Sequence, residues 1–271
     1  MSAALGRPLT SFAAAVGRPF VGFARYVGEL AVLVKETASS LIVAPIRWRL
    51  FMRQVAEIGF RSQLVVMVTG AFTGAVFAAQ TYFQFHRLGM DSAVGAVVSV
   101  SMFRELGPVL TGLMVAGRVG AAIAAEIGTM KVTEQIDALR ALGVQPIDYL
   151  VVPRALAMML SMPLLVAECV GLAVLAGYFV GTQVLNISEA YYLNTMIKFT
   201  TGRDVQMALT KGFFFAIIIV FVSCHQGLNA KEGAVGVGRA PTESVVISSL
   251  GILVANFFLT FALNIIYPGG I

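Results

Sequence analysis

Five long apolar runs are the feature of this sequence that most constrains its fold. They cover residues 64–85, 93–125, 155–181, 212–228 and 245–267. A helix of about 20 mostly apolar residues is enough to cross the ~30 Å hydrocarbon layer of a membrane. Only 12% of the 271 residues are charged, whereas an average soluble domain has about 25%. The sequence therefore predicts an all-α membrane protein with five transmembrane helices.

The distribution of Lys and Arg predicts how these helices are oriented. Eight basic residues precede the first run, and five more lie in the loops 126–154 and 229–243. Few lie in the opposite loops, and cytoplasmic loops are usually the basic ones. We therefore expect a cytoplasmic N-terminus and an external C-terminus. The same loops account for the net charge of +5, so this charge is no argument for a nucleic-acid partner.

The segment before the first run is predicted to lie along the membrane surface. Residues 26–43 are moderately apolar but contain three charges, and a collar of Arg47, Trp48, Arg49 and Arg53 follows. Basic and aromatic side chains of this kind are typical of the headgroup level. We expect an interfacial helix on the inner leaflet, with a short solvated linker helix as the alternative. The predicted division is an N-terminal cytoplasmic and interfacial segment, 1–62, and a five-span domain, 63–271.

Two adjacent charges, Arg104 and Glu105, lie about a dozen residues into the second run, ~18 Å down a helix that rises ~1.5 Å per residue. A charge at this depth costs at least ~2.5–3.5 kcal/mol unless it faces a cavity or a partner. Neighbouring side chains point about 100° apart, so each charge is expected to find a partner on another helix. Pro108 is predicted to kink the helix beside them. The alternative is an ion pair that only locks the helices together.

A short amphipathic helix is predicted for residues 133–142, in the second cytoplasmic segment. Thr133 is the expected N-cap and Gly143 the expected end. Its apolar stripe comprises Ile136, Leu139 and Leu142, and its charged face comprises Glu134, Asp137 and Arg140. Such a helix suits docking into a groove of a cytoplasmic partner, and an ordinary loop helix is the alternative.

The sequence shows no catalytic equipment of its own. Neither glycine-rich stretch ends in the GK[ST] of a nucleotide-binding loop, and no serine lies in a nucleophile-elbow motif. The two cysteines lie inside apolar runs and predict neither a disulfide nor a metal site. We therefore expect a protein that is not an enzyme and holds no cofactor or metal.

Residues 103–146, FRELGPVLTGLMVAGRVGAAIAAEIGTMKVTEQIDALRALGVQP, resemble the signature of the MlaE (YrbE) permease family. This family provides the membrane subunits of ABC transporters that work with MCE proteins. The resemblance continues through PRALAMMLSMPLL at 153–165 and into the final run, and it covers about residues 50–267.

The resemblance implies a homodimeric permease of the bacterial inner membrane that moves phospholipid to or from a periplasmic MCE-domain partner. ATP would be bound and hydrolysed by two copies of a cytoplasmic ATPase. The family also allows a small cytoplasmic regulatory subunit as a further partner. It implies that the 133–142 helix is the coupling helix, which engages the ATPase through Glu134, Gln135, Asp137 and Arg140. It also implies an outward-facing lipid cavity lined by Tyr82, Arg104, Glu105 and Lys211.

Two further charges and two rival functions complete these expectations. Lys211, at the expected outer end of the fourth run, would neutralise a phosphate or extend to the interface. Glu168 is the only acid of the third run, and we expect it to pack against Arg104 or Arg118.

The rival functions are an ion-coupled transporter with proton sites at Glu105 and Glu168, and a membrane scaffold that transports nothing.

Overall fold

The computed structural model describes residues 6–43, 47–231 and 233–266, and only the backbone of residues 6–16, 19 and 43. The described residues form helices, turns and loops, with no strand among them. Five helices are long and apolar enough to cross a membrane: Trp48–His86, Asp91–Val132, Ile147–Val184, Gly202–Leu228 and Ala234–Ile266. The predicted all-α fold with five spans is confirmed. The C-terminal residues 268–271 lie outside the described residues.

Three of the five spans contain π-helical turns within longer helices. The first comprises α2 (Trp48–Val55), a π turn and α3 (Arg61–His86). The second comprises α4 (Val94–Ser101), α5 (Gly107–Val115) and α6 (Ala121–Val132), separated by two π turns. The third is centred on α8 (Val152–Phe179), and the last two are α10 (Gly202–Leu228) and α11 (Ala234–Ile266). The predicted boundary between residues 62 and 63 falls inside the first of these continuous helices.

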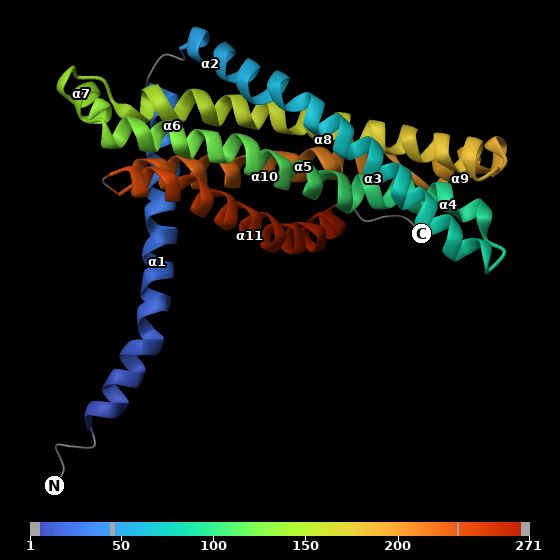
Figure 1. Cartoon of the computed structure of the whole chain (residues 1–271), viewed down its shortest axis with the longest axis horizontal. Coiled ribbons are helices and arrows are strands. Elements are labelled where there is room, and N and C mark those ends of the chain that lie inside the picture. The colour runs from blue at the N-terminus through green and yellow to red at the C-terminus, as the bar shows by residue number, and fades with distance from the viewer. Residues whose placement is uncertain (1–5, 44–46, 232, 267–271) are drawn as a thin grey trace.

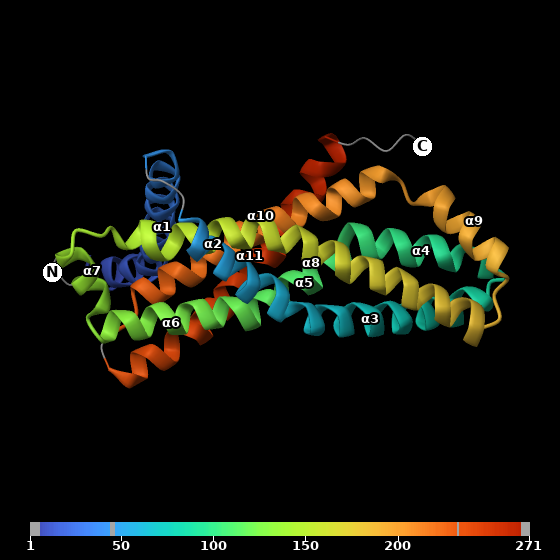
Figure 2. The ribbon, with the colours of Figure 1, turned by 90° about the horizontal axis from the view of Figure 1, so that it is seen from above.

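Close approach of α3 and α8 forms one seam of the bundle, and the two helices lie side by side in both views (Figures 1 and 2). A Cβ atom added at Gly74 would lie 2.0 Å from the carbonyl oxygen of Ala173, and one at Gly70 would lie 2.5 Å from that of Cys169. Only glycine allows backbones to come this close, as small residues at four-residue spacing predict.

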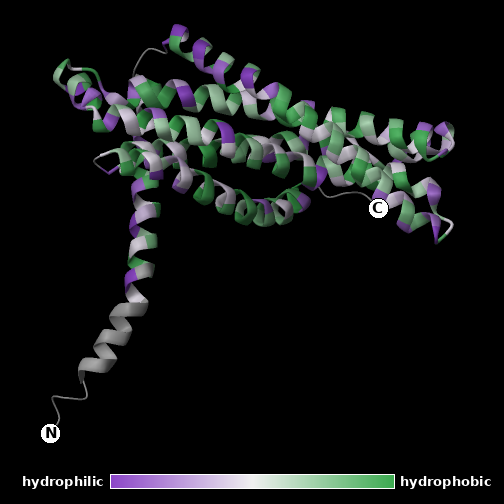
Figure 3. Cartoon of the chain, in the orientation of Figure 1, coloured by the Kyte–Doolittle hydropathy of each residue, from purple (hydrophilic) through white to green (hydrophobic). Residues whose placement is uncertain are grey.

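The fourth and fifth spans differ in how much of their surface the chain itself covers. In α10, 67% of the most apolar stretch is buried, whereas in α11 the figure is 11%. The helix α11 nevertheless consists largely of apolar residues (Figure 3). The helix α10 is therefore the centre of the bundle, and α11 presents a wide apolar face to its surroundings.

The helix α1 (Gly6–Val43) runs across the long axis of the bundle, as expected for a helix in the plane of a membrane surface (Figure 1). It is longer than the predicted 26–43. Glu29 lies 3.1 Å from Nε2 of His225 in α10, and the Tyr26 ring meets the same imidazole edge-on. Leu33 and Thr37 are buried against the bundle. These contacts hold α1 to one end of the spans.

A short helix that the sequence analysis missed, α9 (Glu189–Phe199), closes the opposite end. Its Tyr192 is fully buried, because Gly95 and Gly181 leave room for the ring. Burial raises the pKa of the Tyr192 hydroxyl to about 12. The helices α7 (Gln135–Ala141) and α9 therefore mark the two ends of the bundle (Figure 1).

Candidate functional site

A cluster of polar and charged side chains lies level with the centre of the apolar run of the first span, where the second span meets the beginning of α10 and the C-terminal part of α11. Its depth follows from the packing of neighbouring helices. Gly107 packs on Val170, and the adjacent Cys169 packs on Gly70 in the first span. Arg104, about one turn beyond Gly107, thus lies level with residues 73–74, the centre of the apolar run 64–85.

Arg104 finds its partner on another helix, as predicted, and this helix is α10. Its Nε atom donates to Oδ1 of Asp204 at 2.6 Å, and Asp204 is fully buried. The other carboxylate oxygen of Asp204 accepts from the backbone N–H of Thr201 at 2.8 Å and from its hydroxyl at 3.0 Å. Asp204 therefore both caps the first turn of α10 and neutralises a buried guanidinium. Asp204 was not among the predicted site residues, although T-G-R-D has capping-box spacing.

Glu105 also finds partners on other helices, and they come from both α10 and α11. Its carboxylate lies 2.9 Å from Nζ of Lys211. It accepts from the Asn256 side-chain amide at 2.8 Å and from the Thr260 hydroxyl at 2.9 Å. The expectation that Arg104 and Glu105 each pair outside their own helix is confirmed. Three spans are joined through this one carboxylate.

The backbone beside these charges departs from regular α-helix. Residues Met102–Leu106 form a π turn, and Pro108 follows it. Because proline has no N–H, it gives the Arg104 carbonyl no helical partner at i+4. Lys211 donates its Nζ proton to that carbonyl at 2.6 Å instead. The disturbance expected at Pro108 thus takes the form of a π turn that creates an acceptor for a buried lysine.

Lys211 joins Arg104 and Glu105 as expected, but its ammonium group is buried rather than accessible. It is fully buried and also lies within hydrogen-bonding distance of Thr260, at 2.9 Å. It neither extends to the interface nor offers its charge to the surface. By contrast, the side chains of Arg104 and Glu105 are each 39% exposed. The charges of this cluster that remain accessible are therefore Arg104 and Glu105, both in the second span.

Tyr82, the fourth residue expected in the lipid cavity, lies apart from this cluster. It is about 12 Å beyond the level of Arg104 along the helix axis, and its ring stacks on His86 with centroids 5.0 Å apart. The cluster thus unites three of the four expected cavity residues.

The expected pairing of Glu168 with Arg104 or Arg118 is wrong. Arg104 pairs with Asp204, and Nη1 of Arg118 donates to the Ser62 hydroxyl at 2.9 Å. Glu168 instead lines a small groove between the first and third spans. The reason is geometric, since Glu168 lies on a face of α8 that packs toward the first span.

The helix α7 begins two residues later than predicted. Thr133 is not its N-cap, because the Thr133 hydroxyl donates to the Thr129 carbonyl at 2.8 Å and so closes the preceding helix. Glu134 then turns the chain with a left-handed φ of 60°. The apolar stripe is also shorter than expected, because Ile136 is buried but Leu142 is 77% exposed.

The four residues expected on the coupling surface are all exposed at this end of the bundle: Glu134, Gln135, Asp137 and Arg140. Asp137 is paired with Arg140 at 2.9 Å and with Lys131 at 3.7 Å. Exposed pairs of this kind add little stability, so the face is available for a partner.

Comparison with known proteins agrees with this architecture. A family model described as Permease MlaE matches residues 51–262. A probable ABC transporter permease protein of Rickettsia typhi is 48% identical over 222 residues, which cover 82% of this chain and 86% of the relative. A probable ABC transporter permease protein of Synechocystis is 41% identical over 210 residues, covering 78% and 80%. The chloroplastic protein TRIGALACTOSYLDIACYLGLYCEROL 1 of Arabidopsis thaliana is 36% identical over 229 residues, covering 84% and 65%.

Proposed function

Because this chain belongs to the MlaE family of ABC transporter permeases, we propose that it moves phospholipid between the bacterial inner membrane and a periplasmic MCE-domain partner. The chain would work as a homodimer, with ATP bound and hydrolysed by two copies of a cytoplasmic ATPase. A small cytoplasmic regulatory subunit would bind to the ATPase.

One observation carries this proposal: Arg104 and Glu105 keep 39% of their side chains exposed, level with the centre of the apolar run of the first span. Charges at this depth are too costly to face hydrocarbon, so they require a wet cavity or a partner. The neighbouring surface of α11 is apolar. A chamber with apolar walls and a few charges matches the two halves of a phospholipid molecule. The Arabidopsis relative carries the name of a glycolipid, which is in keeping with a lipid cargo.

The exposed face of α11 supports the homodimer. Ten large apolar side chains of α11 are more than half exposed, and six of these lie between residues 250 and 261: Leu250, Leu253, Val254, Phe257, Phe258 and Phe261. Asn256 and Thr260 of the same helix hold Glu105. A second copy related by a two-fold axis would present the same surface. The two polar clusters would then face one shared chamber.

The two ends of the bundle differ in a way that suits two different partners. The exposed charges of α7 and the basic start of the first span lie at one end, and α9 lies at the other. We assign the α7 end to the cytoplasm, because basic residues favour that side. Closure of the ATPase dimer would then push on α7, and the α9 end would meet a ring of MCE subunits.

The rival ion-coupled mechanism gains no support from the site. Glu105 is already bonded to Lys211, Asn256 and Thr260, and Glu168 lies in a separate groove. Two acids that share no site do not form a proton relay.

The proposal is tested by reconstituting the full chain in liposomes with its ATPase and measuring transfer of labelled phospholipid to the MCE-domain protein. We expect transfer with ATP and none with a non-hydrolysable analogue. Transfer by the permease alone, driven by a proton gradient, would contradict the proposal. Assembly of all partners without any transfer would favour the scaffold.

A further inference from the structure

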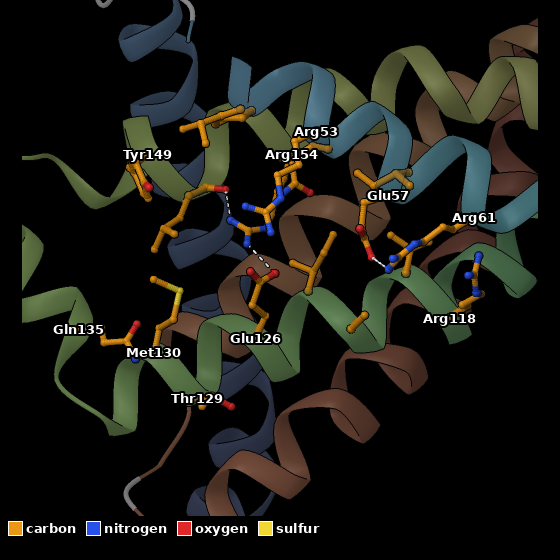
Figure 4. A pocket seen from close by; sticks show the side chains of 18 residues that line it. Arg53, Glu57, Arg61, Arg118, Glu126, Thr129, Met130, Gln135, Tyr149 and Arg154 are labelled. Atoms are coloured by element: carbon orange, nitrogen blue, oxygen red, sulfur yellow. Dashed lines mark hydrogen bonds and ion pairs between the residues drawn. The ribbon is translucent and has the colours of Figure 1, made fainter. Parts of the chain in front are cut away.

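A polar cavity lies well away from the cluster around Arg104 and Glu105, between the start of the first span and α6 (Figure 4). It measures about 850 Å³, and α8 lines its third side. Four arginines reach it from three helices: Arg53, Arg61, Arg118 and Arg154. Only two carboxylates, Glu57 and Glu126, line it as well.

The charges in this cavity do not balance. Arg61 pairs with Glu57 one turn away, and Arg154 lies 2.7 Å from Glu126. Among the described residues, Arg118 makes one side-chain hydrogen bond, to the Ser62 hydroxyl at 2.9 Å, and no ion pair. Arg53 has no carboxylate partner in the part of the chain that the structure describes. Two positive charges therefore remain for an anion from outside.

Arg154 provides an independent sign of a missing ligand. Its side chain is only 5% exposed. One terminal nitrogen donates to the Leu150 carbonyl at 2.7 Å and the other to Glu126, but the Nε atom is buried without a partner. A buried N–H that makes no hydrogen bond is costly. Arg154, which lines the cavity, thus keeps one buried N–H without a partner beside an excess of positive charge.

The depth of the cavity identifies the class of anion. Arg118 bonds to Ser62, and the charge-free run of the first span begins two residues later at Leu64. The innermost arginines therefore lie at the edge of the hydrocarbon layer, the level of the lipid phosphates. Apolar side chains, among them Ile58, Val119 and Ile123, line the same cavity and offer contact to the glycerol and upper acyl chains.

We propose that this cavity binds the phosphate of an anionic phospholipid in the cytoplasmic leaflet, with Arg53 and Arg118 as its principal cationic contacts. Guanidinium groups suit this role, because their planar forks match the oxygens of a phosphate. The site is separate from the cluster around Arg104 and Glu105. The inference rests on the membrane orientation proposed above but requires neither transport nor an ATPase.

Native mass spectrometry of the purified full chain, titrated with dioleoyl phosphatidylglycerol in detergent, tests the site. Arg53→Gln is expected to weaken binding of the tightest lipid about tenfold, since a charge-assisted bond is lost. Arg49→Gln is the matched control: it removes the same charge one turn away on the same helix, from a residue that does not line the cavity. Arg118→Lys should retain more binding than Arg118→Gln.

Three results would overturn the proposal. Equal loss of binding in Arg49→Gln and Arg53→Gln would indicate attraction by general charge. Equal affinity for dioleoyl phosphatidylcholine would exclude selection of an anionic headgroup. Displacement of the lipid by millimolar inorganic phosphate would indicate that the cavity binds a soluble phosphate rather than a lipid. Because no ATPase or acceptor protein is present, these outcomes are independent of whether the chain transports lipid.

Discussion

The ammonium nitrogen of Lys211 lies 2.9 Å from a carboxylate oxygen of Glu105, between the fourth and second spans. Lys211 is fully buried, while Glu105 remains partly exposed. The lysine therefore supports the carboxylate from inside the protein, and the carboxylate faces the proposed chamber. One ion pair thereby joins the packing of three helices to the surface that cargo would meet.

The first prediction concerns this pair. Glu105→Gln leaves the Lys211 charge buried with neutral partners only. A broken, fully buried pair costs about 3–5 kcal/mol, and we expect less here because the Glu105 side chain is 39% exposed. Lys211→Met in addition should recover a large part of that stability. Thermal unfolding of the detergent-solubilised single and double variants measures the coupling. Purely additive effects would show that the two residues do not act as a pair.

The second prediction concerns Asp204. Asp204→Asn removes the charge that neutralises Arg104 and weakens the cap on α10, so we expect strong destabilisation. Thr201→Ala removes only the hydroxyl part of the cap, for which about 1 kcal/mol is typical. Unfolding midpoints of the two variants should therefore differ clearly. Equal midpoints would mean that the Arg104 contact adds nothing.

The third prediction concerns α7. The double variant Glu134→Lys, Asp137→Lys reverses charge on an exposed surface, so the protein should fold but no longer co-purify with its ATPase. Glu189→Lys in α9, at the other end of the bundle, is the control and should retain the ATPase. Full recovery of the ATPase with the double variant would remove α7 from the coupling surface.

The fourth prediction concerns the seam between the first and third spans. Gly74→Ala would place a Cβ 2.0 Å from the Ala173 carbonyl oxygen, so the helices must separate at a cost of about 1–3 kcal/mol or more. Gly171→Ala meets no atom within 4 Å and should be neutral or stabilising by up to about 1 kcal/mol. Similar melting temperatures for both variants would contradict the close packing.

The helical fold was predictable because its signals are local. Twenty apolar residues in a row specify a span whatever surrounds them. Glycines four residues apart, such as Gly70 and Gly74, are typical of a close contact between helices. The partners of buried charges were not predictable, because they depend on how distant helices face each other. The sequence shows that Arg104 needs a partner. The residues around Arg104 in the sequence do not identify this partner as Asp204, which lies 100 residues away.

The same reason explains the errors. Lys211 lies at the end of an apolar run, yet α10 extends beyond that run to Gly202 and places Lys211 inside the bundle. The polar stretch T-G-R-D, residues 201–204, does not look like part of an apolar span. It nevertheless begins the helix, because capping and ion pairing satisfy its polar groups. Thr133 has the chemistry of an N-cap, but its hydroxyl bonds backward to Thr129. Local propensity cannot decide between two such partners.

The central claim is that cargo passes through a chamber between two copies of this chain, and locking that chamber tests it most directly. Single cysteines at Leu250, Val254 and Phe258 of α11, with the buried Cys169 and Cys224 replaced, allow the two copies to be joined by oxidation. The rate of ATP-driven phospholipid transfer is then measured before oxidation, after oxidation and after reduction. We predict that a joined dimer stops transfer and that reduction restores it. Full transfer by a completely joined dimer at every position, or no joining at any position, would contradict the account.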